Sequence, residues 1–194
     1  MKNTRIVFFF GILAIIALAA MAVFLPKKLQ VEEIRTIATS SQITITKGDM
    51  KISSQVFQHN GSVPSKYTCD ADNVSPPLSI SEVPEGAKSL ALIVDDPDAP
   101  VGDWVHWLVW NIPVGTAEIG EATAPEGIEG TTDFGEPGWG GPCPPSGTHR
   151  YFFKLYALDT ELDLPATGKK KDLEEAMKDH ILDEVELIGT YKRM

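Results

Sequence analysis

An acidic cluster follows one of the most hydrophobic segments of the chain. Residues 95–100 read Asp-Asp-Pro-Asp-Ala-Pro and come directly after residues 89–94, which read Ser-Leu-Ala-Leu-Ile-Val. A plain turn is one interpretation, because Asp and Pro both favour turns. Three carboxylates close together at the end of a strand repel one another, however, and a plain turn does not require that repulsion. Asp96 and Asp98 are therefore candidate binding or acid–base residues.

A histidine interrupts a second hydrophobic segment, residues 104–111, which read Trp-Val-His-Trp-Leu-Val-Trp-Asn. Side chains of a strand alternate between its two faces, so we expect His106 to share a face with Trp104, Leu108 and Trp110. A lone histidine in such a setting is either a hydrogen-bonded core residue or a group that faces a ligand.

A third candidate segment is the Gly- and Pro-rich stretch at residues 138–148, which runs into His149 and Tyr151. Glycines such as Gly141 allow backbone N–H groups to approach an anion closely. His149 and Tyr151 are two positions apart, so both side chains can point to one face of a strand. The alternative is an ordinary surface loop that leads into a strand.

Several catalytic signatures are missing from the sequence. It has no G-x-S-x-G elbow, no P-loop, no H-E-x-x-H and no dinucleotide-binding glycine pattern. Asp96, Asp98, His106 and His149 have no recognised metal-ligand spacing, so we expect neither a metal nor a cofactor.

The elements that must position these residues are short β-rich runs separated by Gly, Pro and Asn. Strands are expected at residues 51–58, 89–94, 105–112, 150–158 and 184–192. One helix is expected at residues 170–182, with an apolar face formed by Leu173, Ala176, Met177 and Ile181. No helix separates the three central strands, which disfavours a parallel α/β fold. The pattern predicts a mainly β domain with one or two peripheral helices.

A membrane segment is expected before this domain. Residues 6–25 form a run of 20 residues without a polar side chain, enough for a helix of about 30 Å, the thickness of a bilayer core. We interpret residues 1–27 as an anchor, residues 28–47 as a linker and residues 48–194 as the domain, placed outside the cytoplasm. The alternative is a cleaved signal peptide and a secreted domain, because Ala17 and Ala19 resemble a cleavage site.

Charge and cysteine content narrow the function classes. The chain has 17 Lys and Arg against 27 Asp and Glu, a net charge of −10. This balance argues against a nucleic-acid partner, which requires a basic surface. The two cysteines, Cys69 and Cys143, can form one disulfide in an oxidising compartment or remain two small buried side chains.

The three segments together resemble the phosphatidylethanolamine-binding protein family, also called Raf-kinase-inhibitor-like proteins, in its bacterial and archaeal branch. Residues 96–100 are similar to the first signature of that family, and residues 141–151 are similar to the second. The strand that begins at Trp104 lies between them, and residues 67–70, 75–78 and 187–193 also fit. The resemblance covers the chain from about residue 50 onward.

The resemblance implies an antiparallel two-sheet β-sandwich with a small anion-binding cavity at one end. It also implies a cis peptide bond between Ala99 and Pro100. The pocket residues that it implies, with Asp98 and Pro100 at the rim, are Asp96, Asp98, Pro100, His106, Gly141, Pro142, His149 and Tyr151.

The expected function is that of a non-enzymatic, regulatory binding protein for a small anion: phosphate, a phospholipid headgroup or a carboxylate. Imidazole, phenol and backbone N–H groups can all donate hydrogen bonds to such a ligand. A carboxylate beside an imidazole favours its protonated form, so binding is expected to strengthen as the pH falls. The alternatives are an inhibitor of a kinase or protease that acts through the pocket rim, and a phosphohydrolase or lyase.

Overall fold

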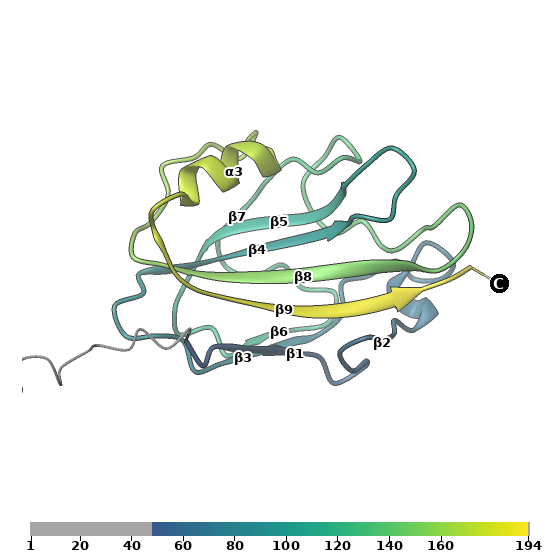
Figure 1. Ribbon diagram of the computed structural model, residues 1–194, viewed down its shortest axis with the longest axis horizontal. Coiled ribbons are helices and arrows are strands. Elements are labelled where there is room, and N and C mark those ends of the chain that lie inside the picture. The colour runs from purple at the N-terminus through teal and green to yellow at the C-terminus, as the bar shows by residue number, and fades with distance from the viewer. Residues whose placement is uncertain (1–47, 194) are drawn as a thin grey trace, which may run out of the picture. The chain divides into compact units, whose positions relative to one another are not determined.

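The computed structural model describes residues 48–193 (Figure 1). Within them the chain forms nine strands, one α-helix and one short 3-10 helix. Their bounds are β1 (Lys51–Ser53), β2 (Gly61–Ser62), η1 (Ser65–Tyr67), β3 (Leu78–Ser81), β4 (Ser89–Asp96), β5 (Trp104–Ile112), β6 (Glu118–Ile119), β7 (Ile128–Glu129), β8 (His149–Leu158), α3 (Lys170–Met177) and β9 (Ile181–Tyr191).

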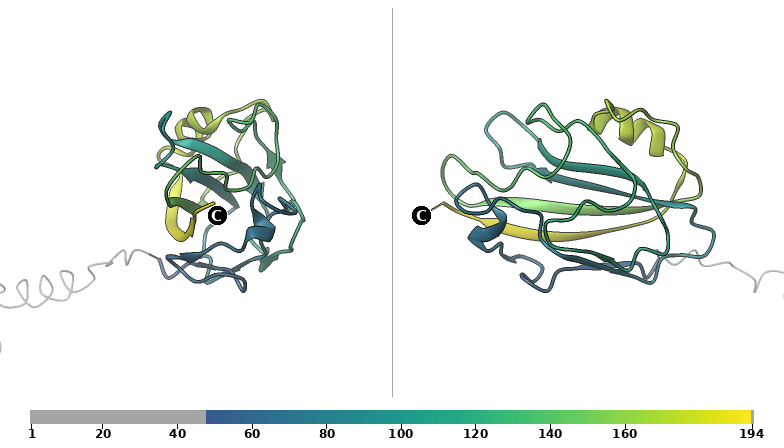
Figure 2. Two further views of the ribbon diagram at one scale, coloured as in Figure 1. Left: turned by 90° about the vertical axis from the view of Figure 1, so that its right-hand side faces the viewer. Right: turned by 180° about the vertical axis from the view of Figure 1, so that it is seen from behind.

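The strands form two sheets that face each other, as expected for a sandwich (Figure 2). The smaller sheet has the order β1-β3-β6, and the larger has the order β2-β9-β8-β4-β5-β7. All pairs are antiparallel except β2 with β9, which are parallel over Gly61 and Ser62. The expectation of wholly antiparallel sheets is therefore wrong at this one short pair. A parallel pair needs a long connection between its strands, and most of the domain lies between β2 and β9.

Strand β4 is buried on both faces, as its continuous apolar sequence predicts. Leu90, Leu92 and Val94 belong to the hydrophobic cluster between the two sheets. Ala91 and Ile93 belong to a second cluster on the opposite face of the larger sheet. The strand that leads into the acidic cluster is thus fixed from both sides.

Helix α3 covers this second cluster, on the face of the larger sheet that lies away from the smaller one (Figure 1). It buries Leu173 and Met177, but it ends at Met177, so the prediction of a helix to residue 182 is wrong. Asp179 has φ of +65°, a left-handed conformation that an α-helix does not continue through. Ile181 instead opens β9 and is 43% exposed.

The strand expected at residues 51–58 is also shorter, because β1 ends at Ser53. The Ser54 hydroxyl donates to the Pro77 carbonyl (2.7 Å) and accepts from the Val56 N–H, so it replaces a strand ladder with local side-chain bonds. The other four predicted strands are confirmed.

The predicted apolar helix at residues 6–25 and the linker at residues 28–47 lie outside the described residues. Within residues 48–193, no helix is both long enough and apolar enough to cross a membrane.

Candidate functional site

A cavity of about 190 Å3 lies where the end of β4, the start of β5 and the loop before β8 meet. Four of the residues selected from the sequence line it: Asp96, Pro100, His106 and His149. The remaining wall is mainly apolar and consists of Ala99, Val101, Trp104, Phe134, Cys143, Pro144 and Pro145. Segments far apart in the sequence therefore bring two imidazoles and one carboxylate to a single small hollow.

Asp96 and His149 form a buried pair at this cavity, with Asp96 Oδ2 2.7 Å from His149 Nδ1. An ionised carboxylate only accepts hydrogen bonds, so Nδ1 carries the proton and donates it to Asp96. The other carboxylate oxygen, Oδ1, accepts from the Asp98 N–H at 2.9 Å. The carboxylate thereby fixes the orientation of the His149 ring, and Nε2 is the ring nitrogen that remains for a ligand.

His106 is held in a similar way by the backbone. Its Nδ1 donates to the Gly140 carbonyl, and the Gly140 N–H donates back to the His106 carbonyl at 2.9 Å. Burial lowers the pKa of His106 below its usual value, although the Gly140 carbonyl opposes the shift. A neutral His106 with a proton on Nδ1 presents a bare Nε2, which accepts a hydrogen bond and does not donate one.

The face to which His106 points differs from the expectation, because β5 contains a bulge. Val94 pairs with Trp107, whereas Asp95 pairs with Val105, so one extra residue of β5 lies between these two pairs. The His106 ring packs against Tyr151 and Phe134, at centroid distances of 5.2 and 5.5 Å.

Leu108 and Trp110 belong instead to the cluster under α3, so the prediction that they share a face with His106 is wrong. An extra residue shifts the two-residue alternation by one position, which separates His106 from Leu108 and Trp110, whereas Trp104 lines the same cavity as His106.

The three carboxylates of the acidic cluster do not crowd one another, because each has its own partner. Asp95 points away from Asp96, is fully buried, and accepts from Lys154 (2.7 Å) and Lys170 (2.6 Å). The Asp98 carboxylate pairs with Arg150, near the start of β8. Ion pairs and hydrogen bonds thus offset the repulsion expected from the sequence.

Asp98 does not line the cavity, and its partner is Arg150. The carboxylate accepts from Arg150 Nη2 (2.7 Å), from Nε (2.9 Å) and from the Arg150 backbone N–H (2.9 Å). These hydrogen bonds lower the pKa of Asp98 to about 2. Asp98 thereby ties the turn that carries Pro100 to the first residues of β8.

The peptide bond between Ala99 and Pro100 is trans, since no peptide bond among residues 48–193 is cis. The expectation of a cis bond at this position is wrong. Trans is the isomer of lower free energy for an X–Pro bond, by about 0.5–1 kcal/mol.

Gly141, Pro142 and Tyr151 also lie beside the cavity and not on its surface. The Gly141 N–H donates to Asn73 Oδ1 at 2.9 Å, and the Pro142 carbonyl accepts from the Cys69 N–H at 3.1 Å. The backbone N–H groups of Gly140 and Gly141 are therefore engaged within the chain and do not point at a ligand.

Tyr151 is fully buried, and its ring packs edge-on against that of His106. Burial raises its pKa, and the negative charge of nearby Asp96 raises it further. The phenol remains protonated at every physiological pH.

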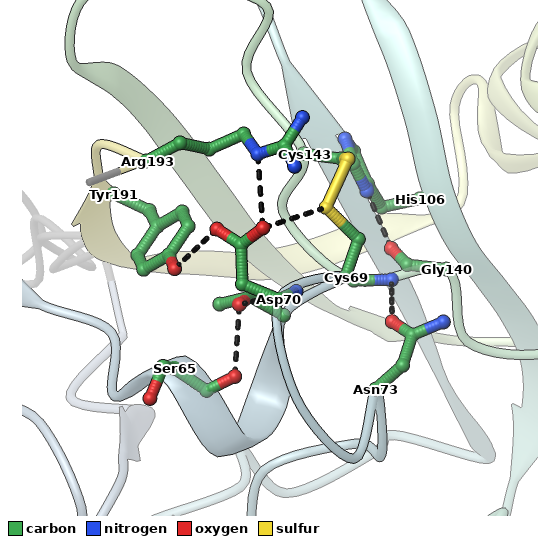
Figure 3. Close-up of a disulfide and its surroundings, with 11 residues drawn as sticks. Ser65, Cys69, Asp70, Asn73, His106, Gly140, Cys143, Tyr191 and Arg193 are labelled. Atoms are coloured by element: carbon green, nitrogen blue, oxygen red, sulfur yellow. Dashed lines mark hydrogen bonds and ion pairs between the residues drawn. A yellow bond between two sulfur atoms is a disulfide. The ribbon is translucent and has the colours of Figure 1, made fainter.

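Among the residues around the cavity, sequence reasoning missed Phe134 and left the pairing of Cys69 and Cys143 open. Cys69 and Cys143 are bonded, which settles the choice between a bridge and two free thiols (Figure 3). Cys143 is exposed and lines the cavity. The available signal was the position of Cys143 inside the Gly- and Pro-rich segment that precedes His149.

The arrangement suits binding by hydrogen bonds to the two Nε2 atoms inside apolar walls. None of the residues that line the cavity carries a hydroxyl or free thiol able to act as a nucleophile. Residues 48–193 contain no group of three or more His, Cys, Asp or Glu side chains able to hold a metal ion.

Comparison with known proteins relates this chain to one family over most of its length. A sequence model described as phosphatidylethanolamine-binding protein matches residues 53–192. A UPF0098 protein of Methanothermobacter thermautotrophicus is 51% identical over 150 residues, which cover 74% of this chain and 99% of the relative. A UPF0098 protein of Pyrococcus horikoshii is 46% identical over 157 residues, which cover 76% of this chain and 78% of the relative.

Two solved structures are similar to the domain. A putative phosphatidylethanolamine-binding protein homologue of Chlamydia trachomatis, CT736, has a TM-score of 0.74 and 41% identity, covering 77% of this chain and 100% of that one. YbcL of E. coli, described as a new member of the mammalian family, has a TM-score of 0.71 and 30% identity, covering 75% of this chain and 99% of that one.

Proposed function

This chain belongs to the phosphatidylethanolamine-binding protein family, and we propose that it binds a small anion in the cavity between Asp96, His106 and His149. The ligand is phosphate, the phosphate of a lipid headgroup, or a carboxylate, and the role is regulatory. The observation that carries the proposal is the orientation of the two rings. Each Nδ1 is already bonded, so both Nε2 atoms are left for a ligand.

Protonation of the rings decides how strongly they bind. An imidazolium with Nδ1 bonded to the protein donates from Nε2 and carries the positive charge that an anion needs. The Asp96 carboxylate compensates the charge of a protonated His149, which limits the cost of holding that charge in a buried pair. The apolar wall around the two rings strengthens hydrogen bonds to the ligand, because it lowers the local dielectric constant.

Calorimetry on the full-length protein in a non-ionic detergent tests this proposal. Phosphate, phosphoethanolamine and acetate are titrated into the wild type, His149→Ala and His180→Ala. His180 is a matched control, because it also pairs with an aspartate (Asp159, 2.8 Å) but is solvent-exposed. We expect saturable binding that falls at least tenfold in His149→Ala and is unchanged in His180→Ala. Equal affinity in all three proteins, or no binding at all, contradicts an anion site here.

A second candidate function is inhibition of a kinase or protease through the rim of the cavity. Val101 and Phe134 favour it, because these apolar side chains flank the cavity and are 78% and 46% exposed. Val101→Ser is then expected to weaken inhibition of the partner enzyme and to leave phosphate binding unchanged. Val114→Ser serves as the control, since Val114 is also exposed (39%) but does not line the cavity.

Catalysis fits the site less well than binding. The Asp96–His149 pair has the geometry of a general base held by a carboxylate, but no hydroxyl or free thiol that this base could activate lines the cavity. Turnover of a phosphomonoester by the wild type, lost in His149→Ala, is the result that would favour a phosphohydrolase over a binding protein.

For its location, we propose that residues 6–25 anchor the domain outside the cytoplasm, on the basis of their apolar sequence alone. Protease digestion of intact cells is expected to remove the domain from the membrane fraction. A domain that is resistant in intact cells and digested only after lysis would contradict this orientation. A domain recovered in the medium would favour a cleaved signal peptide.

A further inference from the structure

We propose that the Cys69–Cys143 disulfide is a thiol–disulfide exchange site whose redox state sets the position of the cavity wall and, with it, the affinity for the ligand. The second part rests on the proposed anion-binding function. The co-reactant is a dithiol reductant, either a small molecule or the dithiol of an oxidoreductase.

The first observation is that the bond is accessible at the cavity. Cys143 is exposed and Cys69 is half-buried, although disulfides inside a domain core are shielded from solvent. Cys143 lines the binding cavity, and both cysteines line a neighbouring cavity of about 180 Å3. Because Cys143 is exposed in the folded domain, we expect a thiolate from solvent to reach its Sγ without unfolding of the domain. Exposed disulfides of this kind are the labile ones.

The second observation is the place of the bond in the loop that builds the cavity wall. Before Cys143, the loop is held by hydrogen bonds of Gly140 to His106, of Gly141 to Asn73 and of Pro142 to the Cys69 N–H. After Cys143, residues 144–148 make no hydrogen bond with any other described residue until β8 begins at His149. The disulfide is the last attachment before Pro144 and Pro145, which form part of the wall.

The third observation concerns the sulfur that is released. Asp70 Oδ1 lies 3.9 Å from Cys69 Sγ. The Asp70 carboxylate is held in place by hydrogen bonds from Tyr191 Oη (2.8 Å) and Arg193 Nε (2.9 Å), as Figure 3 shows. A carboxylate held in this position accepts a hydrogen bond from the Cys69 thiol once the bond is open. The reduced form of Cys69 is thus provided with a partner.

The exchange balances in two steps. A thiolate of the dithiol attacks Cys143 Sγ, the bond between the two cysteines breaks, and the Cys69 sulfur leaves and takes up a proton. The second thiol of the reductant then attacks the mixed disulfide and releases Cys143, which is protonated in turn. The protein gains two electrons and two protons, and the dithiol becomes a disulfide.

Reduction removes the only covalent attachment between the loop and the segment that carries Cys69. Pro144 and Pro145 then lose the attachment at Cys143, while His149 remains in β8 and stays bonded to Asp96. We expect the less stable fold to persist and the wall to move, because neither cysteine belongs to the two hydrophobic clusters that hold the sheets and α3 together. Affinity for phosphate is expected to fall about tenfold.

The test uses the full-length protein, oxidised or reduced with dithiothreitol, together with the double variant Cys69→Ser, Cys143→Ser. Free thiols are counted with an alkylating reagent while near-UV circular dichroism reports the fold. Amide hydrogen exchange is followed for residues 138–148, and phosphate affinity is measured by calorimetry. We expect both thiols to appear with the fold intact, faster exchange in this segment and weaker binding. The double variant is expected to match the reduced protein and to be insensitive to the reductant.

Two results overturn the inference: thiols that appear only when the domain unfolds, or a reduced, folded protein with unchanged exchange and affinity. If neither form binds phosphate, the proposed function fails, and the amide hydrogen exchange rates of residues 138–148 alone test redox control of the loop. Faster hydrogen exchange in reduced, folded protein then supports redox control, and unchanged hydrogen exchange overturns it.

Discussion

Replacing Cys69 and Cys143 by serine is expected to destabilise the domain by about 4 kcal/mol. The bond joins residues separated by 74 positions, so it excludes many extended conformations from the unfolded ensemble. The chain-entropy relation for a closed loop of this size gives about 4 kcal/mol at 25 °C. Each kcal/mol shifts the Tm of a domain of this size by roughly 2–4 °C, so the Tm is expected to fall by roughly 8–16 °C.

The assay is urea unfolding of the oxidised wild type, the double variant and each single serine variant. Peptide mapping under non-reducing conditions first confirms that the wild type carries the bond. The single and double variants are expected to lose similar amounts of stability, since each removes the same crosslink. The exposed position of Cys143 keeps the contribution of lost packing small.

A loss below about 1 kcal/mol in all variants would refute this reasoning, provided that peptide mapping finds the bond in the wild type. The two segments would then already lie close together in the unfolded chain, and the crosslink would restrict little. A large loss in one single variant alone would instead point to a side-chain contact of that cysteine.

Three further predictions follow from buried groups and close contacts. Affinity for sulfate, whose charge is constant across the range, is expected to rise as the pH falls from roughly 8 to 5, because an imidazole whose Nδ1 is already bonded to the protein donates from Nε2 only when it is protonated. Calorimetry that gives a flat profile contradicts this. Burial lowers the pKa of His106 below its usual value of 6.5, so the unfolded chain binds this proton more readily than the folded chain does. The free energy of unfolding therefore drops as the pH falls below 6.5. Urea unfolding at several pH values should show a smaller drop in His106→Gln, and an equal drop would contradict this reasoning. Gly189→Ala is expected to cost about 1–3 kcal/mol, because its Cβ would lie 2.5 Å from Val63 Cγ2 in the core. The control Gly115→Ala, with no atom within 4 Å of the added Cβ, should leave the urea midpoint nearly unchanged.

The regular part of the fold follows closely from the sequence. The continuous apolar run of β4 predicts a strand buried on both faces, and Ala91 and Ile93 indeed pack under α3 while Leu90 and Leu92 pack between the sheets. The predicted helix was too long because Ile181 continues the apolar spacing of Leu173 and Met177. Hydropathy spacing alone does not register the left-handed backbone at residue 179 that ends the helix.

The site could be predicted less completely, for reasons of local geometry. The bulge in β5 rotates His106 away from Leu108 and Trp110, and no pattern in an alternating strand marks an extra residue. Gly141 was selected for its free backbone N–H, yet that group bonds to Asn73, a residue 68 positions away. Long-range partners of this kind are a property of the folded chain and leave no local signal.

Strand β9 has a consequence for how the domain acquires its structure during synthesis. It follows every other described strand in sequence, yet it lies inside the larger sheet, paired with β8 on one side and β2 on the other. Until residues 181–191 leave the ribosome, both of those strands have an open edge, and Leu187 and Tyr191 are missing from the core. The domain therefore cannot complete its larger sheet while it folds progressively from the N-terminus. Until β9 is available, the growing chain therefore has unpaired strand edges, which are prone to aggregation.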